Sequence, residues 1–294
     1  MAADVVAVFG PTASGKSAAA VELAERIGGE IVSCDAMQLY RGLPILTNQP
    51  TDAELAQASH HLVGVWPLWH EGSVAEYGEI AHRAIDEVLA RRRVAVLCGG
   101  SGLYLRAAAG RLETPPPAAP GSRQRLEQLY DRVGPGPAHA LLAERNPGAA
   151  RAVHANDRRR VVRALELAEA GETLAPASSQ LWEHEPRHPT VVFGLEVDPD
   201  VVRRRIELRT AAMFDRGVED EVRAALGGPL SSTAARIHGL QDVAALLRGE
   251  IDRDEAARRL IVRTRRYAKR QRVWMRRLPG LVPVGSAAEM AERL

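Results

Sequence analysis

The stretch VFGPTASGKSAAA, residues 8–20, decides how the rest of this chain is interpreted. It predicts the end of a buried strand over residues 5–9, a loop over Gly10–Ser17 and a helix over residues 15–27. The loop matches the pattern G-x-x-x-x-G-K-[ST], whose backbone N–H groups and following helix N-terminus bind phosphate while the lysine neutralises it. The expected phosphate-binding residues are Gly10, Thr12, Ala13, Ser14, Gly15, Lys16 and Ser17.

The loop also predicts a metal ligand, because the Ser17 hydroxyl lies where such loops hold a Mg²⁺ ion carried by the phosphates. It does not identify the phosphate compound. Nucleoside triphosphatases usually add an acidic residue after an apolar strand to hold the metal. The apolar strand expected over residues 94–97 is followed instead by Cys98-Gly99-Gly100. ATP, GTP and another pair of phosphates therefore all stay open at this point.

Strands and helices alternate outward from the loop. Strands are expected over residues 5–9, 30–33, 94–97 and 190–197, with helices over 15–27 and 73–92 between them. This alternation predicts an α/β fold with a parallel sheet, in which ligands bind beyond the carboxyl ends of the strands. The phosphate loop, the loop at Asp35 and the loop at Ser101 all follow strands, so we expect them at that edge.

Asp35 and Ser101 are the candidate reactive residues of these loops. The Asp35 carboxylate would orient a metal ion or act as a general base, and a plain solvated carboxylate is the alternative. The Ser101 hydroxyl lies in the glycine-rich turn Gly99–Gly102. It would bind a substrate that the glycines allow to approach closely, although a simple turn serine is equally consistent with the residues alone.

The composition changes after residue 112. The segment 114–121 is rich in proline, residues 122–182 have helical character, and a second break follows over residues 184–189. We therefore expect a core formed by residues 1–112 and 191–294, with a helical insertion over residues 113–190. The chain has no run of apolar residues long enough to span a membrane and no signal peptide at its start. Its two cysteines, Cys34 and Cys98, favour a reduced, cytoplasmic compartment.

Basic residues are concentrated in two places, although the net charge is only +2. The first is Asp157–Arg163, at the start of a helix in the insertion. The second is Arg258–Arg277, which holds ten basic residues and no acidic one within a long helix expected over 252–278. Binding to a nucleic-acid backbone and a solvated helix face are the two explanations. His60-His61 has no partner at metal-ligand spacing, so we expect no metal there.

Taken together, these segments resemble the tRNA dimethylallyltransferases, also called tRNA isopentenyltransferases. The resemblance covers most of the chain, in the order and spacing of the family. It rests on GPTASGKS at 10–17, SCDAMQLYRG at 33–42, HHL at 60–62, GGSGLYLRA at 99–107, DRRRVVRALEL at 157–167, Arg209…Met213…Gly217…Glu221-Val222, and YAKRQRVWMRR at 267–277.

The resemblance implies a P-loop NTPase-like parallel sheet with a helical insertion that binds the tRNA anticodon stem-loop. It implies that the loop holds dimethylallyl diphosphate with Mg²⁺, rather than ATP. The enzyme would transfer the dimethylallyl group to N6 of the adenosine at position 37 of tRNA and release diphosphate. We also expect a cytoplasmic monomer that does not bind membranes.

Site residues carry over at matching positions. Asp35 would be the general base, Arg209 would stabilise the leaving diphosphate, and Ser101, which stands where the family often has threonine, would contact the acceptor site. Residues expected to contact tRNA are Asp35, Gln38, Arg123, Arg159, Arg160, Arg163, Lys269, Arg270, Gln271, Trp274 and Arg276.

The chain departs from the family pattern in one segment. The family commonly has I-G-Y-x-[EQ] where this chain has Ile237-His238-Gly239-Leu240-Gln241, so no tRNA contact is assigned over 235–241. None is assigned over 114–150 either, apart from Arg123. Two other functions compete: a small-molecule kinase, which does not account for the basic clusters, and a non-catalytic RNA-binding protein, which does not account for Asp35 and Ser101.

Overall fold

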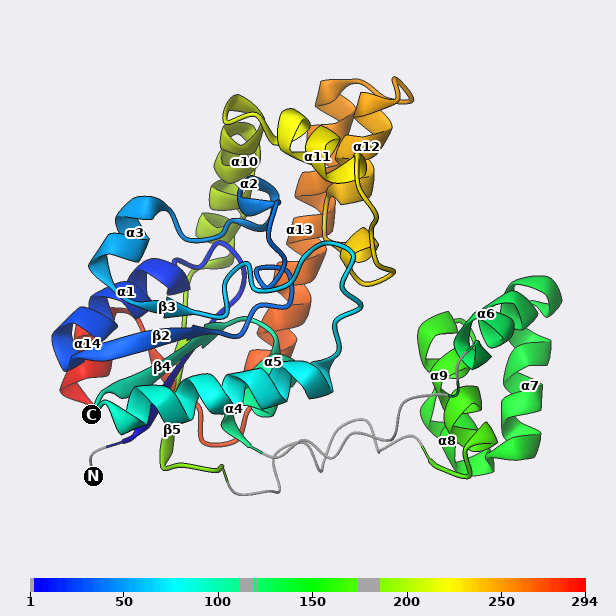
Figure 1. Cartoon of the computed structure of the whole chain (residues 1–294), viewed down its shortest axis with the longest axis horizontal. Helices are drawn as coiled ribbons and strands as arrows, with labels where there is room; N and C mark the ends of the chain where they lie inside the picture. The colour runs from blue at the N-terminus through cyan, green and yellow to red at the C-terminus, as the bar shows by residue number, and fades with distance from the viewer. Residues whose placement is uncertain (1–2, 111–118, 120, 174–185) are drawn as a thin grey trace. The chain divides into compact units, whose positions relative to one another are not determined.

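The computed structural model describes residues 3–110, 119, 121–173 and 186–294. The chain forms two compact units (Figure 1): the first comprises Met1–Leu112 with Glu185–Leu294, and the second comprises Glu113–His184. Most of the proline-rich segment 114–121 and the helical character expected over 174–182 lie outside the described residues. Each unit has its own core and is considered by itself below.

The first unit is built on a parallel sheet, as the alternation of strands and helices predicts. Its strands are ordered β3-β2-β4-β1-β5-β6, and all neighbours are parallel. Their bounds are β1 Val5–Phe9, β2 Gly29–Ser33, β3 His60–His61, β4 Val94–Gly99, β5 Thr190–Leu195 and β6 Val282–Val284. The central strand β1 is fully buried, in keeping with an apolar strand covered on both faces.

The strand register brings the three predicted loops to one edge of the sheet. Phe9 of β1 lies opposite Gly99 of β4, and Ser33 of β2 lies opposite Cys98 of β4. Because parallel strands that begin in register also end together, the segments after Phe9, Ser33 and Gly99 emerge side by side. The phosphate loop, Asp35 and Ser101 therefore start from adjacent strand ends.

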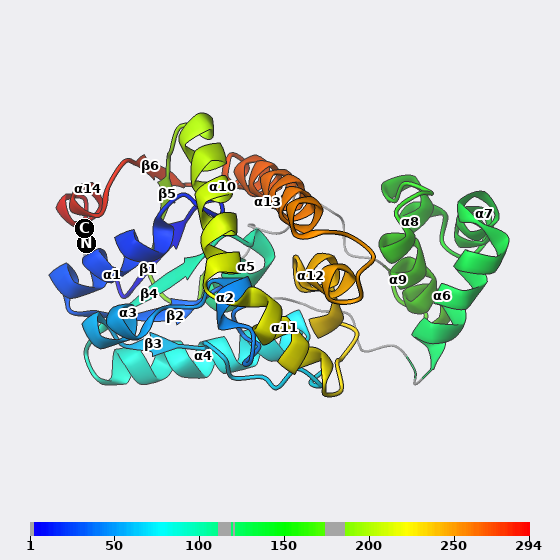
Figure 2. The ribbon, with the colours of Figure 1, turned by 90° about the horizontal axis from the view of Figure 1, so that it is seen from above.

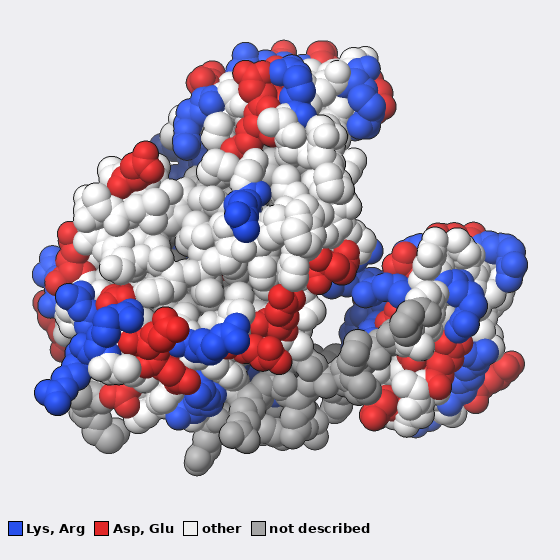
Figure 3. Space-filling model, in the orientation of Figure 1, with Lys and Arg blue, Asp and Glu red and all other residues white. Residues whose placement is uncertain are grey.

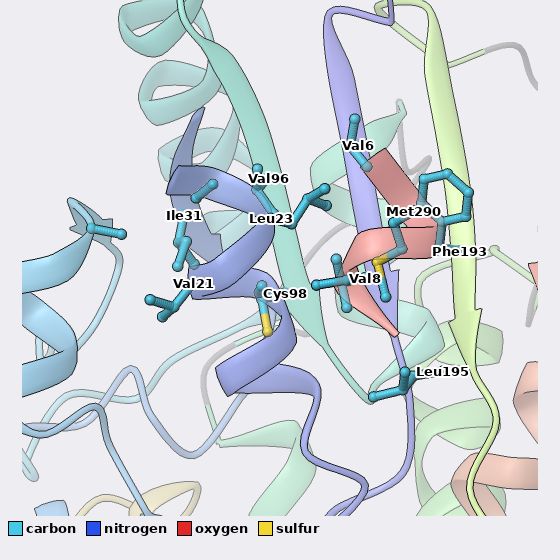
Figure 4. Close-up of a cluster of buried hydrophobic side chains, with 14 of the residues drawn as sticks. Val6, Val8, Val21, Leu23, Ile31, Val96, Cys98, Phe193, Leu195 and Met290 are labelled. Carbon is cyan, nitrogen blue, oxygen red and sulfur yellow. The ribbon is translucent and has the colours of Figure 1, made fainter. Parts of the chain in front are cut away.

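Helices cover both faces of the sheet. On one face, α1 (Lys16–Ile27) and α14 (Ala287–Glu292) pack over the strands, and Figure 4 shows Leu23 and Met290 set against Val8, Val96 and Phe193. Alternate strand residues face the other way, where α4 (Val74–Ala90) and α5 (Gly102–Ala109) contact β4. These two layers hold the site edge rigidly.

The remaining helices of the first unit lie beyond the sheet. They are α2 Pro44–Thr47, α3 Asp52–Gln57, α10 Pro199–Asp215, α11 Val218–Leu226, the short 3₁₀ helix η2 Ala234–Arg236, α12 Leu240–Leu247 and α13 Arg253–Met275. Helices α10 and α13 pack side by side (Figures 1 and 2). Among the described residues, no helix is long and apolar enough to cross a membrane.

Helix α13 begins as its sequence predicts. Asp252 caps the helix, because its side chain accepts a hydrogen bond from the backbone N–H of Glu255 at 2.8 Å. The Glu255 carboxylate pairs with Arg258 and Arg259. The helix buries Ala256, Leu260, Ala268, Gln271 and Met275 along one stripe.

The second unit is a small helical bundle. Its helices are α6 Ser122–Val133, α7 Pro135–Arg145, α8 Pro147–Ala152 and α9 Arg158–Glu169. Leu126, Leu142, Val161 and Leu165 form the centre of a separate apolar core. The insertion was expected to extend to residue 190, but the second unit ends at His184, and the described residues from 186 onward belong to the first unit. The backbone N–H of Arg187 donates to the Ala109 carbonyl, and its side chain pairs with Asp86 of α4 at 2.9 Å.

Candidate active site

A pocket of about 380 Å³ opens at the carboxyl edge of the sheet. Its walls come from the phosphate loop, the start of α1, the loop after β2 and helix α10. The lining residues are Thr12, Ala13, Gly15, Lys16, Ser17, Ala18, Asp35, Gln38, Thr47, Asn48, Glu54, Arg205 and Arg209. Five of the residues expected to bind diphosphate thus share one cavity with Asp35 and Arg209.

The phosphate loop adopts a tightly turned backbone. Gly15 has a φ of 92°, and the alanine two residues earlier, Ala13, has a φ of 63°. The left-handed region favours glycine, so Ala13 is held there by the surrounding structure. The Ser14 hydroxyl is buried and has no hydrogen-bond partner among the described residues. It lies beside Gly10, and Ser14 is not among the residues that line the pocket.

Side chains from distant helices brace this loop. Arg209 of α10 donates from Nη2 to the Thr12 hydroxyl at 2.8 Å, and Arg205, one turn earlier, donates from Nη1 to the Ser14 carbonyl at 2.8 Å. The Gln271 side chain of α13 accepts from the backbone N–H of Thr12 at 2.7 Å. Two helices of the C-terminal half therefore fix a loop formed near the N-terminus.

Arg209 is a buried cation beside the predicted base. Burial lowers the pKa of its guanidinium, whereas the charge of Asp35 raises it. An arginine remains protonated under such a shift, because its ordinary pKa lies far above neutrality. The pocket therefore holds three basic side chains, Lys16, Arg205 and Arg209, together with the Asp35 and Glu54 carboxylates.

Asp35 is held in a defined orientation. Its Oδ1 atom accepts a hydrogen bond from the backbone N–H of Met37 at 3.0 Å, and its own N–H donates to the Ser33 hydroxyl at 3.4 Å. Its Oδ2 atom accepts no hydrogen bond from the described residues. Gln38, which is half-buried, donates to the Asn48 carbonyl at 2.6 Å and accepts from Ser33 at 3.2 Å. Asp35 and Gln38 thus line the pocket with fixed side chains.

Ser101 caps α5 by position, at the turn after β4, and its side chain is half-buried. The glycines around it have a different purpose from the one the sequence suggested. A Cβ atom on Gly99 would lie less than 3.0 Å from the Cys34 backbone, one on Gly100 would meet Gln271 and the Gly10 carbonyl, and one on Gly102 would meet Trp274. Protein groups, rather than a ligand, approach these three glycines.

The α13 residues expected to contact tRNA divide into two sets. Lys269, Arg270 and Arg276 are exposed, and the Arg270 guanidinium lies over the Tyr267 ring at 5.9 Å. Gln271 is only 3% exposed and faces the phosphate loop. Trp274 is half-buried against Gly102. The three cations are exposed to solvent, whereas Gln271 and Trp274 attach the helix to the site edge.

The arginines of the insertion differ in whether they form ion pairs. Arg123 lies near Glu127 and Glu166, and Arg163 pairs with Glu166 at 3.1 Å. Arg159 and Arg160 have no ion-pair partner among the described residues. Basic and acidic side chains intermingle on the face of each unit visible in Figure 3. An arginine that already pairs with a carboxylate is less available to bind an anionic ligand than one without an ion-pair partner.

The structure adds pocket residues that sequence analysis did not single out. Arg205 braces the phosphate loop, and its spacing of four residues from Arg209 on a helix was the available signal. Thr47, Asn48 and Glu54 also line the pocket. Their approach depends on tertiary packing, since Glu221 of α11 accepts hydrogen bonds from the backbone N–H groups of Ile45 and Leu46 at 2.6 and 2.8 Å.

The histidines and the cysteine near the site have structural partners. His61 pairs with the buried Glu30 at 2.7 Å, and His60 bonds to the Ala58 carbonyl. No cluster of His, Cys, Asp or Glu able to hold a metal occurs among the described residues. Cys34 is fully buried, and this burial raises the pKa of its thiol to about 12. Cys34 is therefore a packing residue.

Comparisons with known proteins identify a family. Residues 38–278 match the family described as IPP transferase. A tRNA dimethylallyltransferase from Streptomyces coelicolor is 45% identical over 277 residues, covering 94% of this chain and 88% of that protein. One from Anaeromyxobacter dehalogenans is 41% identical, covering 94% and 91%.

Solved structures give the same result. A tRNA isopentenylpyrophosphate transferase from Bacillus halodurans superposes with a TM-score of 0.72 at 30% identity, covering 98% of this chain and 94% of that one. A eukaryotic dimethylallyltransferase described as acting on tRNA has a TM-score of 0.75 at 22% identity, which supports the fold alone. With the family match and the relatives above, these findings show that the chain belongs to the IPP transferase family of tRNA dimethylallyltransferases.

Proposed function

We propose that this protein transfers a dimethylallyl group from dimethylallyl diphosphate to N6 of adenosine 37 of tRNA and releases diphosphate. The observation that carries the proposal is the pocket itself. It joins a phosphate loop, the Lys16 and Arg209 cations and an oriented carboxylate, Asp35, within one cavity. A prenyl diphosphate needs the first two, and an acceptor that loses a proton needs the third.

The phosphate loop and the two cations would bind the diphosphate end of the donor. As the allylic C–O bond breaks, negative charge grows on the diphosphate oxygens. Lys16, Arg209 and the loop N–H groups are placed to stabilise that charge. Their main contribution would be to the transition state, where the leaving group carries more charge than in the bound donor.

A Mg²⁺ ion fits this donor set. The pocket-lining Ser17 hydroxyl is an oxygen donor of the kind that Mg²⁺ binds, and Mg²⁺ in such sites takes few protein ligands and completes its shell with phosphate and water. Ser17 would hold the ion at the start of α1. When bound, the metal would neutralise charge on the diphosphate.

Asp35 would act as the general base. The N6 lone pair of adenine is delocalised into the ring, so the amine is a poor nucleophile until its proton is removed. As the new N–C bond forms, the proton would pass to Asp35 Oδ2, which accepts no hydrogen bond from the described residues, while Oδ1 stays anchored by Met37. Ser101 would contact the acceptor side of the site.

The target base must leave the anticodon loop to reach this pocket. Flipping a base costs a few kcal/mol, and contacts to the loop must offset that cost. The cations proposed to bind the stem-loop phosphates are the exposed Lys269, Arg270 and Arg276 of α13, with the exposed Arg159 and the half-buried Arg160 of the insertion. We propose a monomeric, cytoplasmic enzyme, since its substrate would be a soluble tRNA.

Replacing Asp35 tests the proposal. Asp35→Asn keeps the size of the side chain and the acceptor for Met37, but removes the base. We expect kcat to fall by about 10²- to 10⁴-fold, the usual contribution of a general base, while tRNA affinity changes little. The matched control is Asp52→Asn, an exposed position at the start of α3. Turnover that survives in Asp35→Asn would remove Asp35 from its role as the base.

A further inference from the structure

Gln271 is a buried polar residue with an unusual position. It lies in the C-terminal half of α13 and is 3% exposed, although most of its neighbours on the helix are cations. Its Oε1 atom accepts a hydrogen bond from the backbone N–H of Thr12 at 2.7 Å. Because an N–H can only donate, this bond fixes the orientation of the amide. Gln271 thereby connects a helix near the C-terminus to the phosphate loop.

The other end of the amide is tightly enclosed. The Nε2 atom is buried and makes no hydrogen bond of good geometry among the described residues, although the Gln271 side chain interacts with the Tyr267 hydroxyl one turn earlier on α13. It packs against Gly100, where an added Cβ atom would collide with it and with the Gly10 carbonyl. A buried amide without a well-formed donor bond costs stability, which favours a role for Gln271 at the phosphate loop beyond packing.

Trp274 provides a second attachment on the same side of α13. It lies three residues after Gln271, and its ring packs on Gly102, next to Ser101. One helix face thus touches both the phosphate loop and the Ser101 turn. Lys269, Arg270 and Arg276, which are exposed, point elsewhere on the same helix. A ligand that orders or shifts α13 by binding its cations would therefore also affect the phosphate loop and the Ser101 turn.

We propose that Gln271 is a positioning residue through which α13 couples binding of a polynucleotide to binding of diphosphate. This inference rests on the proposed function, because it takes tRNA as the polyanion on the cations of α13. The hydrogen bond between Gln271 and Thr12 joins α13 to the phosphate loop, so whatever limits the motion of α13 also limits that of the Thr12 backbone. With tRNA bound, α13 is held, Gln271 fixes Thr12, and the loop presents its remaining N–H groups to the diphosphate. Coupling of this kind is reciprocal, so diphosphate tightens tRNA binding equally.

The test measures both affinities in the full-length protein. Binding of inorganic diphosphate with Mg²⁺ is followed by titration calorimetry, with and without unmodified tRNA, and tRNA binding is measured separately on filters. We expect tRNA to tighten diphosphate binding by about fivefold or more in the unaltered protein. Gln271→Met keeps the volume of the side chain but removes its hydrogen bond. We expect it to weaken diphosphate binding about tenfold and to abolish the effect of tRNA.

Gln57→Met, at the exposed end of α3, is the matched control and is expected to retain both the affinity and the coupling. A thermal melt of each variant establishes that it is folded. Equal coupling in Gln271→Met and the unaltered protein would overturn the inference, and so would the absence of coupling in the unaltered protein. A protein that fails to bind tRNA on the filters would instead overturn the proposed function, so the two failures are distinguishable.

Discussion

Three glycines, at the end of β4, in the turn after it and at the start of α5, are required by close packing of the protein itself. Gly99, Gly100 and Gly102 face the end of β2, the phosphate loop with α13, and Trp274, respectively. At Gly99 the opposing atoms are backbone atoms of Cys34, which cannot rotate away. A side chain there would push apart the two strand ends that carry Asp35 and Ser101. These residues thus determine how closely the two reactive loops approach each other.

We expect Gly99→Ala to destabilise the fold by about 1–3 kcal/mol, the range for overpacking a tight interior site. Chemical denaturation measures this as a lower free energy of unfolding. Gly136→Ala is the control, because no atom lies near its added Cβ and it sits in the first turn of α7. Alanine favours the helix there, so the control is expected to be neutral or slightly stabilising. Equal stability of the two variants would contradict the packing argument.

At the scale of elements, β2, β3 and the end of α4 are joined by one buried carboxylate. Glu30 of β2 accepts hydrogen bonds from Arg91, which follows α4, at 2.7 and 3.1 Å, and pairs with His61 of β3. It is 5% exposed. The Arg91 hydrogen bonds lower the pKa of Glu30 below its ordinary value of 4.5, although burial opposes them, and His61 lowers it further.

This lowered pKa predicts how stability depends on pH. In the unfolded chain Glu30 takes up a proton near pH 4.5, whereas in the fold it resists protonation to lower pH. The stabilisation is therefore present above that value and is lost as the pH falls through the folded pKa. Thermal melts between pH 7 and pH 3 should show Glu30→Gln less stable at pH 7, with the difference shrinking toward pH 3. A difference that stays constant with pH would contradict this account. Glu22→Gln, at an exposed pair with Arg26, is the control.

At the scale of the whole molecule, the exposed cations of α13 predict a strong dependence of tRNA affinity on salt. Each phosphate contact releases counterions, and the slope of log K against log salt concentration is about −0.9 per contact for a duplex. The double variant Lys269→Ala, Arg276→Ala should make that slope shallower by the contribution of about two phosphate contacts. The measurement is filter binding between low and moderate salt. A control replaces Arg26, an exposed cation of α1. A slope unchanged in the double variant would exclude α13 from tRNA binding.

The fold was largely predictable from local patterns. The phosphate loop, the strands flanking it and the capped helix α13 each carry their own signal within a short window, and strand ends in a parallel sheet must meet at one edge. The partner of Gln271 was not predictable, because the spacing of residues on a helix indicates which face is buried but not which loop that face contacts. Its contact with Thr12 spans nearly the whole chain. The same holds for Glu221, whose partners Ile45 and Leu46 are set by tertiary packing.

The central claim is that the phosphate loop holds a prenyl diphosphate for transfer to tRNA. The most direct test incubates the purified protein with Mg²⁺, radiolabelled dimethylallyl diphosphate and unmodified tRNA, with a parallel titration of ATP. We predict label in the tRNA and no appreciable binding of ATP. Unlabelled tRNA together with tight binding of ATP would contradict the claim and favour a kinase.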